Sequence, residues 1–120
     1  MTTILIVDDD KTMQKIFQRW LESKGYATLI ASDGNEAVAL AQSERPGLIL
    51  MDLRLPELDG WEATRQIKAN LDTAHIPIIA LTGASRAEER QASLDVGCDA
   101  YLVKPVPLTE LAAQVAALLE

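Results

Sequence analysis

The chain has 120 residues, enough for one domain with a single hydrophobic core, and we expect residues 1–120 to form one such domain. Its 18 acidic and 11 basic side chains give a net charge of −7, which disfavours direct binding to nucleic acid because the phosphates would be repelled. The single cysteine, Cys98, excludes an internal disulfide and a cysteine-based metal cluster. The N-terminus, MTTILIVDDD, lacks the basic start of a secretory signal, and no apolar run reaches the ~20 residues of a membrane span. We therefore expect a cytoplasmic protein with no membrane partner.

Short apolar runs alternate along the chain with longer amphipathic segments. The runs predict strands at 3–7, 27–31, 48–51, 76–81 and 100–103. Their nearly continuous hydrophobicity is typical of parallel strands that are covered on both faces. Helical patterns occupy about 11–24, 34–44, 60–70, 85–96 and 107–119. Five successive strand–helix units predict an α/β fold built on a five-stranded parallel sheet.

Three of the expected strands end in charged side chains. The first is followed by Asp8, Asp9 and Asp10, the third by Asp52 and the fifth by Lys104. Charged groups beside a buried strand are costly unless the protein needs them there. If these strands are parallel neighbours, their carboxyl ends share one edge of the sheet and the side chains converge. The sequence therefore predicts a divalent cation beside a carboxylate.

The aspartates admit a structural and a functional interpretation. One aspartate after the first strand would suffice to cap the helix that follows. Three in a row repel one another, which favours a bound cation, and oxygen ligands of this kind suit Mg²⁺, which takes only one or two carboxylates. Asp52 alone would be a turn or capping residue, but opposite the acid cluster it becomes a candidate nucleophile or metal ligand.

The ends of the fourth and fifth expected strands carry Thr82 and Lys104. Thr82 ends the fourth expected strand, where a hydroxyl beside small residues leaves room for an incoming anion. Lys104 precedes Pro105, whose ring favours extended geometry at Lys104 and permits a cis bond. By contrast, Glu88 and Glu89, with the arginine that follows, are interpreted as a solvated helix face.

Together these residues and spacings resemble the receiver domain of two-component response regulators, the CheY-like family, over essentially the whole chain. The pattern is an acidic pair after the first strand, DLRLPELDG around Asp52, Thr82 thirty positions later, and Lys104-Pro105 a further twenty-two positions on. The resemblance implies a doubly wound, flavodoxin-like sheet with the strand order 2-1-3-4-5.

The resemblance also implies a phosphoacceptor and a metal site. Asp52 would accept the phosphoryl group and also bind the metal, with Asp9 as a direct Mg²⁺ ligand and Asp8 as a ligand through water. Arg54 would supply its backbone carbonyl to the metal. Mn²⁺ is expected to substitute for Mg²⁺.

The remaining implied roles concern the response to phosphorylation. Thr82 and Lys104 would bind phosphoryl oxygens, and Tyr101 occupies the position of the family's aromatic switch. Met13 and Ile16, apolar positions on the first helix, would dock on the histidine-bearing partner. That partner would be a histidine kinase or a histidine phosphotransfer protein, and the output protein stays unidentified. The domain would be a signalling module that assists its own phosphorylation and dephosphorylation, not an enzyme acting on other substrates.

Several alternatives compete with this interpretation. A haloacid dehalogenase-type phosphohydrolase also uses a strand-end aspartate with Mg²⁺, but it requires a second acid where this chain has Arg54. A flavodoxin-like binder would need a phosphate loop after the first strand, where the acid cluster would repel a flavin phosphate. A receiver-like module that is never phosphorylated normally lacks a key residue, and none is missing here. The sequence is also compatible with a receiver domain excised from a longer regulator or hybrid kinase.

Overall fold

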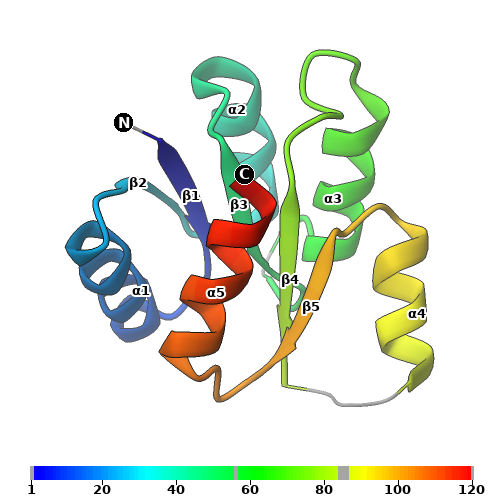
Figure 1. Ribbon diagram of the computed structural model, residues 1–120. Coiled ribbons are helices and arrows are strands. Elements are labelled where there is room, and N and C mark those ends of the chain that lie inside the picture. Colours follow the sequence, from blue (N-terminus) through cyan, green and yellow to red (C-terminus); the bar gives the residue numbers. More distant parts are fainter. Residues whose placement is uncertain (1, 56, 84–86, 120) are drawn as a thin grey trace.

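The computed structural model describes residues 2–55, 57–83 and 87–119, in which five strands alternate with five helices (Figure 1). The strands are β1 (Thr3–Val7), β2 (Ala27–Ala31), β3 (Leu48–Asp52), β4 (Ile78–Thr82) and β5 (Ala100–Val103). The helices are α1 (Lys11–Ser23), α2 (Gly34–Glu44), α3 (Gly60–Ala69), α4 (Ala87–Asp95) and α5 (Leu108–Leu119). None of the helices in the described ranges combines the length and the apolar character that crossing a bilayer requires.

All five strands pair in parallel, in the order β2-β1-β3-β4-β5. This arrangement confirms the predicted α/β class and strand order. The register sets Val7 of β1 beside Met51 of β3, and Asp52 beside Leu81 of β4. The carboxyl ends of the three central strands therefore lie along one edge of the sheet, where the side chains that follow them can meet.

Helices cover both faces of the sheet, which explains why the strands are apolar at consecutive positions. Along β1, Ile4 and Ile6 are buried in a core shared with α1 and α5. Leu5 and Val7 point to the opposite face and are buried in a core shared with α2 and α3. In a strand, successive side chains alternate between faces, so a strand with two covered faces has no position for an exposed polar residue.

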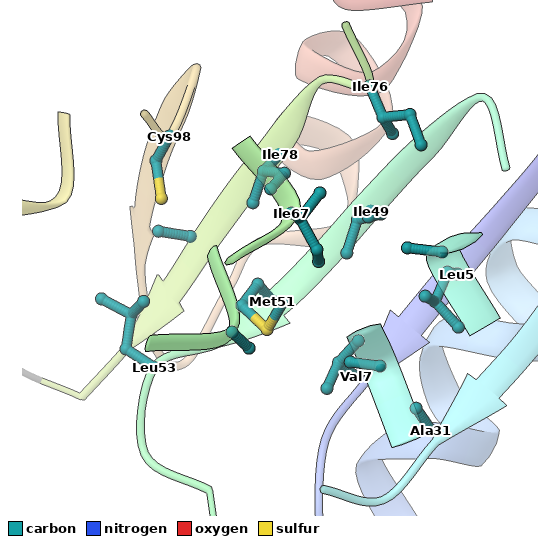
Figure 2. Packing of buried hydrophobic residues seen from close by; sticks show 14 residues of the cluster. Leu5, Val7, Ala31, Ile49, Met51, Leu53, Ile67, Ile76, Ile78 and Cys98 are labelled. Carbon is teal, nitrogen blue, oxygen red and sulfur yellow. The ribbon is translucent and has the colours of Figure 1, made fainter. Parts of the chain in front are cut away.

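The core on the α2 and α3 side is the larger of the two clusters in the described chain (Figure 2). Leu5 and Ile49 extend from neighbouring strands, and Ile67 of α3 belongs to the same buried cluster. Cys98, which precedes β5, closes the end of this core and is 5% exposed. Burial raises the pKa of the Cys98 thiol to about 11, so at neutral pH it is a small apolar filler.

The helix α4 is held to the rest of the domain by few apolar side chains. Its sequence, AEERQASLD, contains a single large apolar residue, Leu94, which is 39% exposed. Its buried Ser93 donates its hydroxyl to the backbone carbonyl of Arg90 within the same helix. Because apolar burial is the main source of helix docking energy, α4 is weakly anchored compared with α1, whose Phe17 and Leu21 are fully buried.

Element boundaries follow the predicted ranges, with one informative shift. The fourth strand was expected from residue 76 but begins at Ile78, because Pro77 has no amide hydrogen to donate to the ladder. The carbonyl of Pro77 still accepts from the Ile49 amide at 2.9 Å, so it guides the strand into register. The helix expected from residue 85 begins at Ala87, and residues 85 and 86 lie outside the described ranges.

Candidate functional site

Three carboxylates gather at the carboxyl edge of the sheet. Asp8 follows β1 and Asp52 ends the neighbouring strand β3. With Asp9 they place one oxygen each within 4.8 Å of one another. Asp8 is 0% and Asp52 6% exposed, whereas Asp9 faces solvent. The cluster thus joins two buried carboxylates to one that is open to water, a set of oxygen ligands that suits Mg²⁺.

Asp10, the third aspartate of the run, has a different role. It is the N-cap of α1, and its Oδ1 accepts from the backbone amides of Thr12 at 2.8 Å and Met13 at 3.4 Å. The capping interpretation is therefore right for Asp10, and the metal-binding roles of Asp8 and Asp9 stay predictions.

Lys104 brings a positive charge to the acid cluster. It follows β5, and its Nζ lies 3.2 Å from Asp8 Oδ2 and 3.0 Å from Asp52 Oδ2. Burial by itself lowers the pKa of Lys104, but hydrogen bonds and charge attraction from Asp52 and Asp8 outweigh it and raise the pKa above its ordinary value. Lys104 therefore stays protonated at neutral pH. The Lys104–Pro105 bond is cis, as the sequence permits.

Burial disfavours the ionised form of Asp8. Burial raises its pKa, although the Asp10 amide donates to its Oδ1 at 2.9 Å and Lys104 lowers the pKa as well. The negative charge of Asp52 adds to the rise. A second cation at this edge would offset the repulsion that a single lysine leaves in place.

Gln14 supports the turn that carries Asp8, a role that the sequence pattern did not predict. Its side-chain amide donates to the Asp8 backbone carbonyl at 2.6 Å and to Ser32 Oγ at 3.1 Å, and the residue is 5% exposed. These bonds join the turn after β1 to the end of β2. Its position along the helix could have indicated that it is buried, because Gln14 lies on the same buried face of α1 as Phe17 and Leu21.

The loop after β3 closes tightly around Asp52. The Arg54 amide donates to Asp52 Oδ1 at 2.9 Å, which fixes the orientation of the carboxylate. Gly60, the first residue of α3, donates its amide to the Leu53 carbonyl. A Cβ atom at Gly60 would lie only 2.2 Å from the Asp52 carbonyl oxygen, so a residue without a side chain is required here.

Thr82 and Tyr101, the two expected switch residues, lie close to each other. The buried Thr82 hydroxyl donates to Glu89 Oε1 at 2.9 Å. Burial raises the pKa of the Tyr101 phenol, and the nearby Glu89 carboxylate raises it further. The interpretation of Glu89 as part of a solvated helix face is therefore wrong, because the side chain reaches inward to the site, whereas its neighbour Glu88 is exposed.

The two expected docking residues lie on α1, the helix that follows the acid cluster in the chain. Met13 is half-buried and packs against the core between the sheet, α1 and α5. Ile16 is 40% exposed, which is unusual for a large apolar side chain in this chain. Docking on these residues stays a prediction.

Comparison with known proteins identifies the class. The family model described as "Response regulator receiver domain" matches residues 4–116. The response regulator MprA of Mycolicibacterium vanbaalenii is 43% identical over 116 residues, which cover 97% of this chain and 49% of that protein.

Solved structures agree with this match. A putative response regulator from Chloroflexus aurantiacus superimposes with a TM-score of 0.93 at 30% identity, covering 98% of this chain and 97% of that one. The receiver domain of the sensor histidine kinase PA1611 from Pseudomonas aeruginosa, solved with a magnesium ion coordinated in its active site cleft, gives 0.91 at 38% identity, covering 98% and 97%.

The chain therefore belongs to the response regulator receiver domain family, whose members are phosphoacceptor signalling domains of two-component systems. Membership confirms the resemblance that the sequence suggested and displaces the phosphohydrolase and flavin-binding alternatives. The chain spans about half the length of the MprA relatives that it matches.

Proposed function

We propose that the domain accepts a phosphoryl group on Asp52 from a phosphohistidine of a histidine kinase or a histidine phosphotransfer protein. The observation that carries this proposal is the setting of Asp52. It is a buried carboxylate at the end of a central strand, held by the Arg54 amide on one oxygen and by Lys104 on the other. Transfer forms an O–P bond at Asp52 and breaks the N–P bond of phosphohistidine, whose electron pair returns to the imidazole.

Charge neutralisation is the main contribution that the site makes to this transfer. A phosphoryl group that approaches Asp52 meets the negative charges of Asp8 and Asp9, and phosphoryl transfer depends mainly on positioning and electrostatic stabilisation. Lys104, 3.0 Å from Asp52, offers its ammonium to the phosphoryl oxygens. The domain thereby assists its own phosphorylation and dephosphorylation and acts on no separate substrate.

The acid cluster fits a divalent metal. Asp9, Asp52 and the Arg54 backbone carbonyl would ligate Mg²⁺ directly, and Asp8 would do so through water, since three carboxylate oxygens already lie within 4.8 Å of one another. Bound Mg²⁺ would supply positive charge to both the carboxylates and the phosphoryl oxygens. We expect Mn²⁺ to substitute because it has the same preference for oxygen ligands.

The phosphorylated form would differ from the resting form at Thr82 and Tyr101. New phosphoryl oxygens on Asp52 would attract the Thr82 hydroxyl from the neighbouring strand, and Tyr101 would move into the space that is vacated. Two packings then compete, and phosphorylation shifts their populations toward the one that binds the output partner. The output protein, or an output domain in a longer polypeptide, would recognise that packing, and we infer a cytoplasmic setting for the exchange.

Phosphorylation by a small donor tests the assignment of Asp52. Incubation with acetyl phosphate and Mg²⁺ is expected to add one phosphoryl group, seen by intact mass, as an acid-stable and base-labile label. Asp52→Asn is expected to remain unlabelled, because its amide is not a nucleophile. Asp72→Asn, which alters an exposed acid outside the cluster, is the matched control and should be labelled normally. Labelling of Asp52→Asn at the wild-type level would refute the assignment.

A further inference from the structure

The Thr82 hydroxyl donates a hydrogen bond to a carboxylate that lies outside the acid cluster. Glu89 is the third residue of α4, and its Oε1 accepts from Thr82 Oγ1 at 2.9 Å. A hydroxyl carries one proton, and an ionised carboxylate can only accept. In the resting packing the single proton of Thr82 is therefore used by Glu89.

Tyr101 of β5 lies beside this contact. Burial and the charge of Glu89 raise the pKa of its phenol, whereas the Thr82 hydroxyl lowers it. Thr82, Glu89 and Tyr101 thus bring together side chains of β4, α4 and β5.

The position of Thr82 makes the contact relevant to Asp52. Thr82 directly follows Leu81, the register partner of Asp52 in the neighbouring strand. Under the proposed function a phosphoryl group on Asp52 needs the same proton that Glu89 accepts, and both acceptors cannot have it. The helix that carries Glu89 is weakly anchored by apolar contacts, so the Thr82 bond has a comparatively large share in fixing its first turns.

We propose that Glu89 is a positioning residue that competes with the phosphoryl group for the Thr82 hydroxyl and thereby stabilises the resting packing. This inference rests on the proposed function of Asp52 and adds a regulator of the same site. Removal of Glu89 takes one acceptor away from Thr82 and one contact away from the start of α4, so the activated packing becomes more populated before any phosphoryl group arrives.

Affinity for a phosphoryl mimic tests the competition. The apparent dissociation constant of beryllium fluoride in the presence of Mg²⁺ is measured by calorimetry for the wild type, Glu89→Ala and Glu89→Gln. Glu89→Ala is expected to bind about three- to tenfold more tightly, the range set by the net worth of one hydrogen bond. Glu89→Gln keeps an acceptor oxygen without the charge and is expected to fall between the wild type and Glu89→Ala. Unchanged or weaker binding by both variants would overturn the proposal.

The same substitution in a Thr82→Val background separates competition from a general charge effect. Thr82→Val is expected to bind the mimic more weakly, and adding Glu89→Ala should change that affinity by less than about twofold, because no hydroxyl is left to compete for. A full gain in that background would mean that Glu89 acts by repulsion at a distance, and the proposal would fail.

Two further variants complete the design. Glu88→Ala removes an equally charged, exposed neighbour and is expected to leave the affinity within about twofold of the wild type. A gain equal to that of Glu89→Ala would overturn the proposal. Asp52→Asn identifies the other kind of failure. If the wild type binds the mimic no better than Asp52→Asn, the assignment of Asp52 is wrong and the role of Glu89 falls with it.

Discussion

Asp8 shows how the charge of a single buried residue opposes the fold. Its side chain is fully buried beside a second acid, and burial raises its pKa above the ordinary value even though Lys104 lies 3.2 Å away. An acid whose pKa is higher in the folded than in the unfolded chain makes ionisation favour unfolding. The metal-free domain therefore carries an electrostatic strain at its functional edge.

Asp8→Asn is expected to stabilise the metal-free domain by about 1 kcal/mol at neutral pH, the usual scale of a single substitution. Below the ordinary pKa of 3.8, Asp8 is protonated in both states and carries no penalty, and the penalty is complete once the pH passes the raised folded pKa. The gain in the free energy of unfolding from Asp8→Asn should thus shrink as the pH falls. Urea unfolding of both proteins with a chelator, at several pH values from about 4 to 8, measures this gain. An advantage that is independent of pH would contradict this account.

A site residue could be predicted where the sequence immediately around it shows its position in the fold. Asp52, Thr82 and Lys104 each end an apolar run, so the pattern places them at strand ends, and parallel pairing brings the ends together. Gln14 and Glu89 carry no such signal. Their roles depend on which way a helix turns toward groups distant in sequence, and tertiary packing decides that.

At the scale of elements, the start of α3 determines where Asp52 sits. Gly60→Ala would place a Cβ atom 2.2 Å from the Asp52 carbonyl oxygen and 2.6 Å from Leu53 Cα, so the backbone must move apart. Overpacking of this kind typically destabilises a domain by about 1–3 kcal/mol. We expect thermal unfolding at lower temperature and slower labelling by acetyl phosphate.

Gly83→Ala is the control for Gly60→Ala, because a Cβ atom there meets no atom within 4 Å of the described chain. Its stability should stay within about 0.5 kcal/mol of the wild type. Equal stability of the two variants would show that the close approach of α3 to Asp52 is not restrictive.

The outer edge of α1 is the element expected to meet the phosphohistidine partner. Ile16→Glu alters an exposed side chain, so it should cost less than about 0.5 kcal/mol of stability. Met13→Lys removes a half-buried contact and should cost more. Both are expected to slow transfer from a phosphorylated histidine phosphotransfer protein while labelling by acetyl phosphate stays near normal.

The control for α1 is Leu71→Glu, which changes a side chain that is 93% exposed and follows α3 in the chain, and phosphorylation by either donor should be unaffected by it. Equal loss with both donors for Ile16→Glu would show that Ile16 supports the fold or the site and is not a docking residue.

Periodicity predicted the elements well because each buries its own apolar face. The observed bounds differ from the predicted ones where the backbone chemistry or a weak apolar pattern decides where an element begins. At the start of β4 the missing amide hydrogen of Pro77 shortens the strand, and α4 has one large apolar residue with which to define its face. The strand order came from the family resemblance, because alternating strands and helices fix a parallel sheet without fixing which strands are neighbours.

For the whole molecule, metal binding is expected to be linked to folding. The oxygens of Asp8, Asp9 and Asp52 come together only when β1 and β3 are paired, so the unfolded chain has no comparable site. Mg²⁺ at one hundred times its dissociation constant is therefore expected to stabilise the domain by about 2.7 kcal/mol. Thermal unfolding with and without Mg²⁺ measures this, and a chelator should reverse it.

Asp9→Ala is the matched variant for this metal effect, since Asp9 is exposed and its loss should barely alter the metal-free domain. Most of the stabilisation by Mg²⁺ should disappear in it, and Asp72→Ala should retain it. As the pH falls, protons compete for the carboxylates and the Mg²⁺ effect should weaken in the wild type. Full stabilisation of Asp9→Ala would exclude the proposed ligand set.

The two tryptophans of the chain occupy settings that differ in kind. Trp61 lines a hollow beside the site together with Arg54 and Glu89. Trp20 is on α1, where its indole donates to the Leu108 carbonyl at 3.0 Å and the Lys24 ammonium lies 4.5 Å from the ring centre. Indole emission follows local polarity and nearby charge, so Trp61 is an optical reporter beside the site, whereas Trp20 reports on the contact between α1 and the start of α5. In a Trp20→Phe protein, the fluorescence of Trp61 alone would report whether the site is occupied, and no dye need be attached.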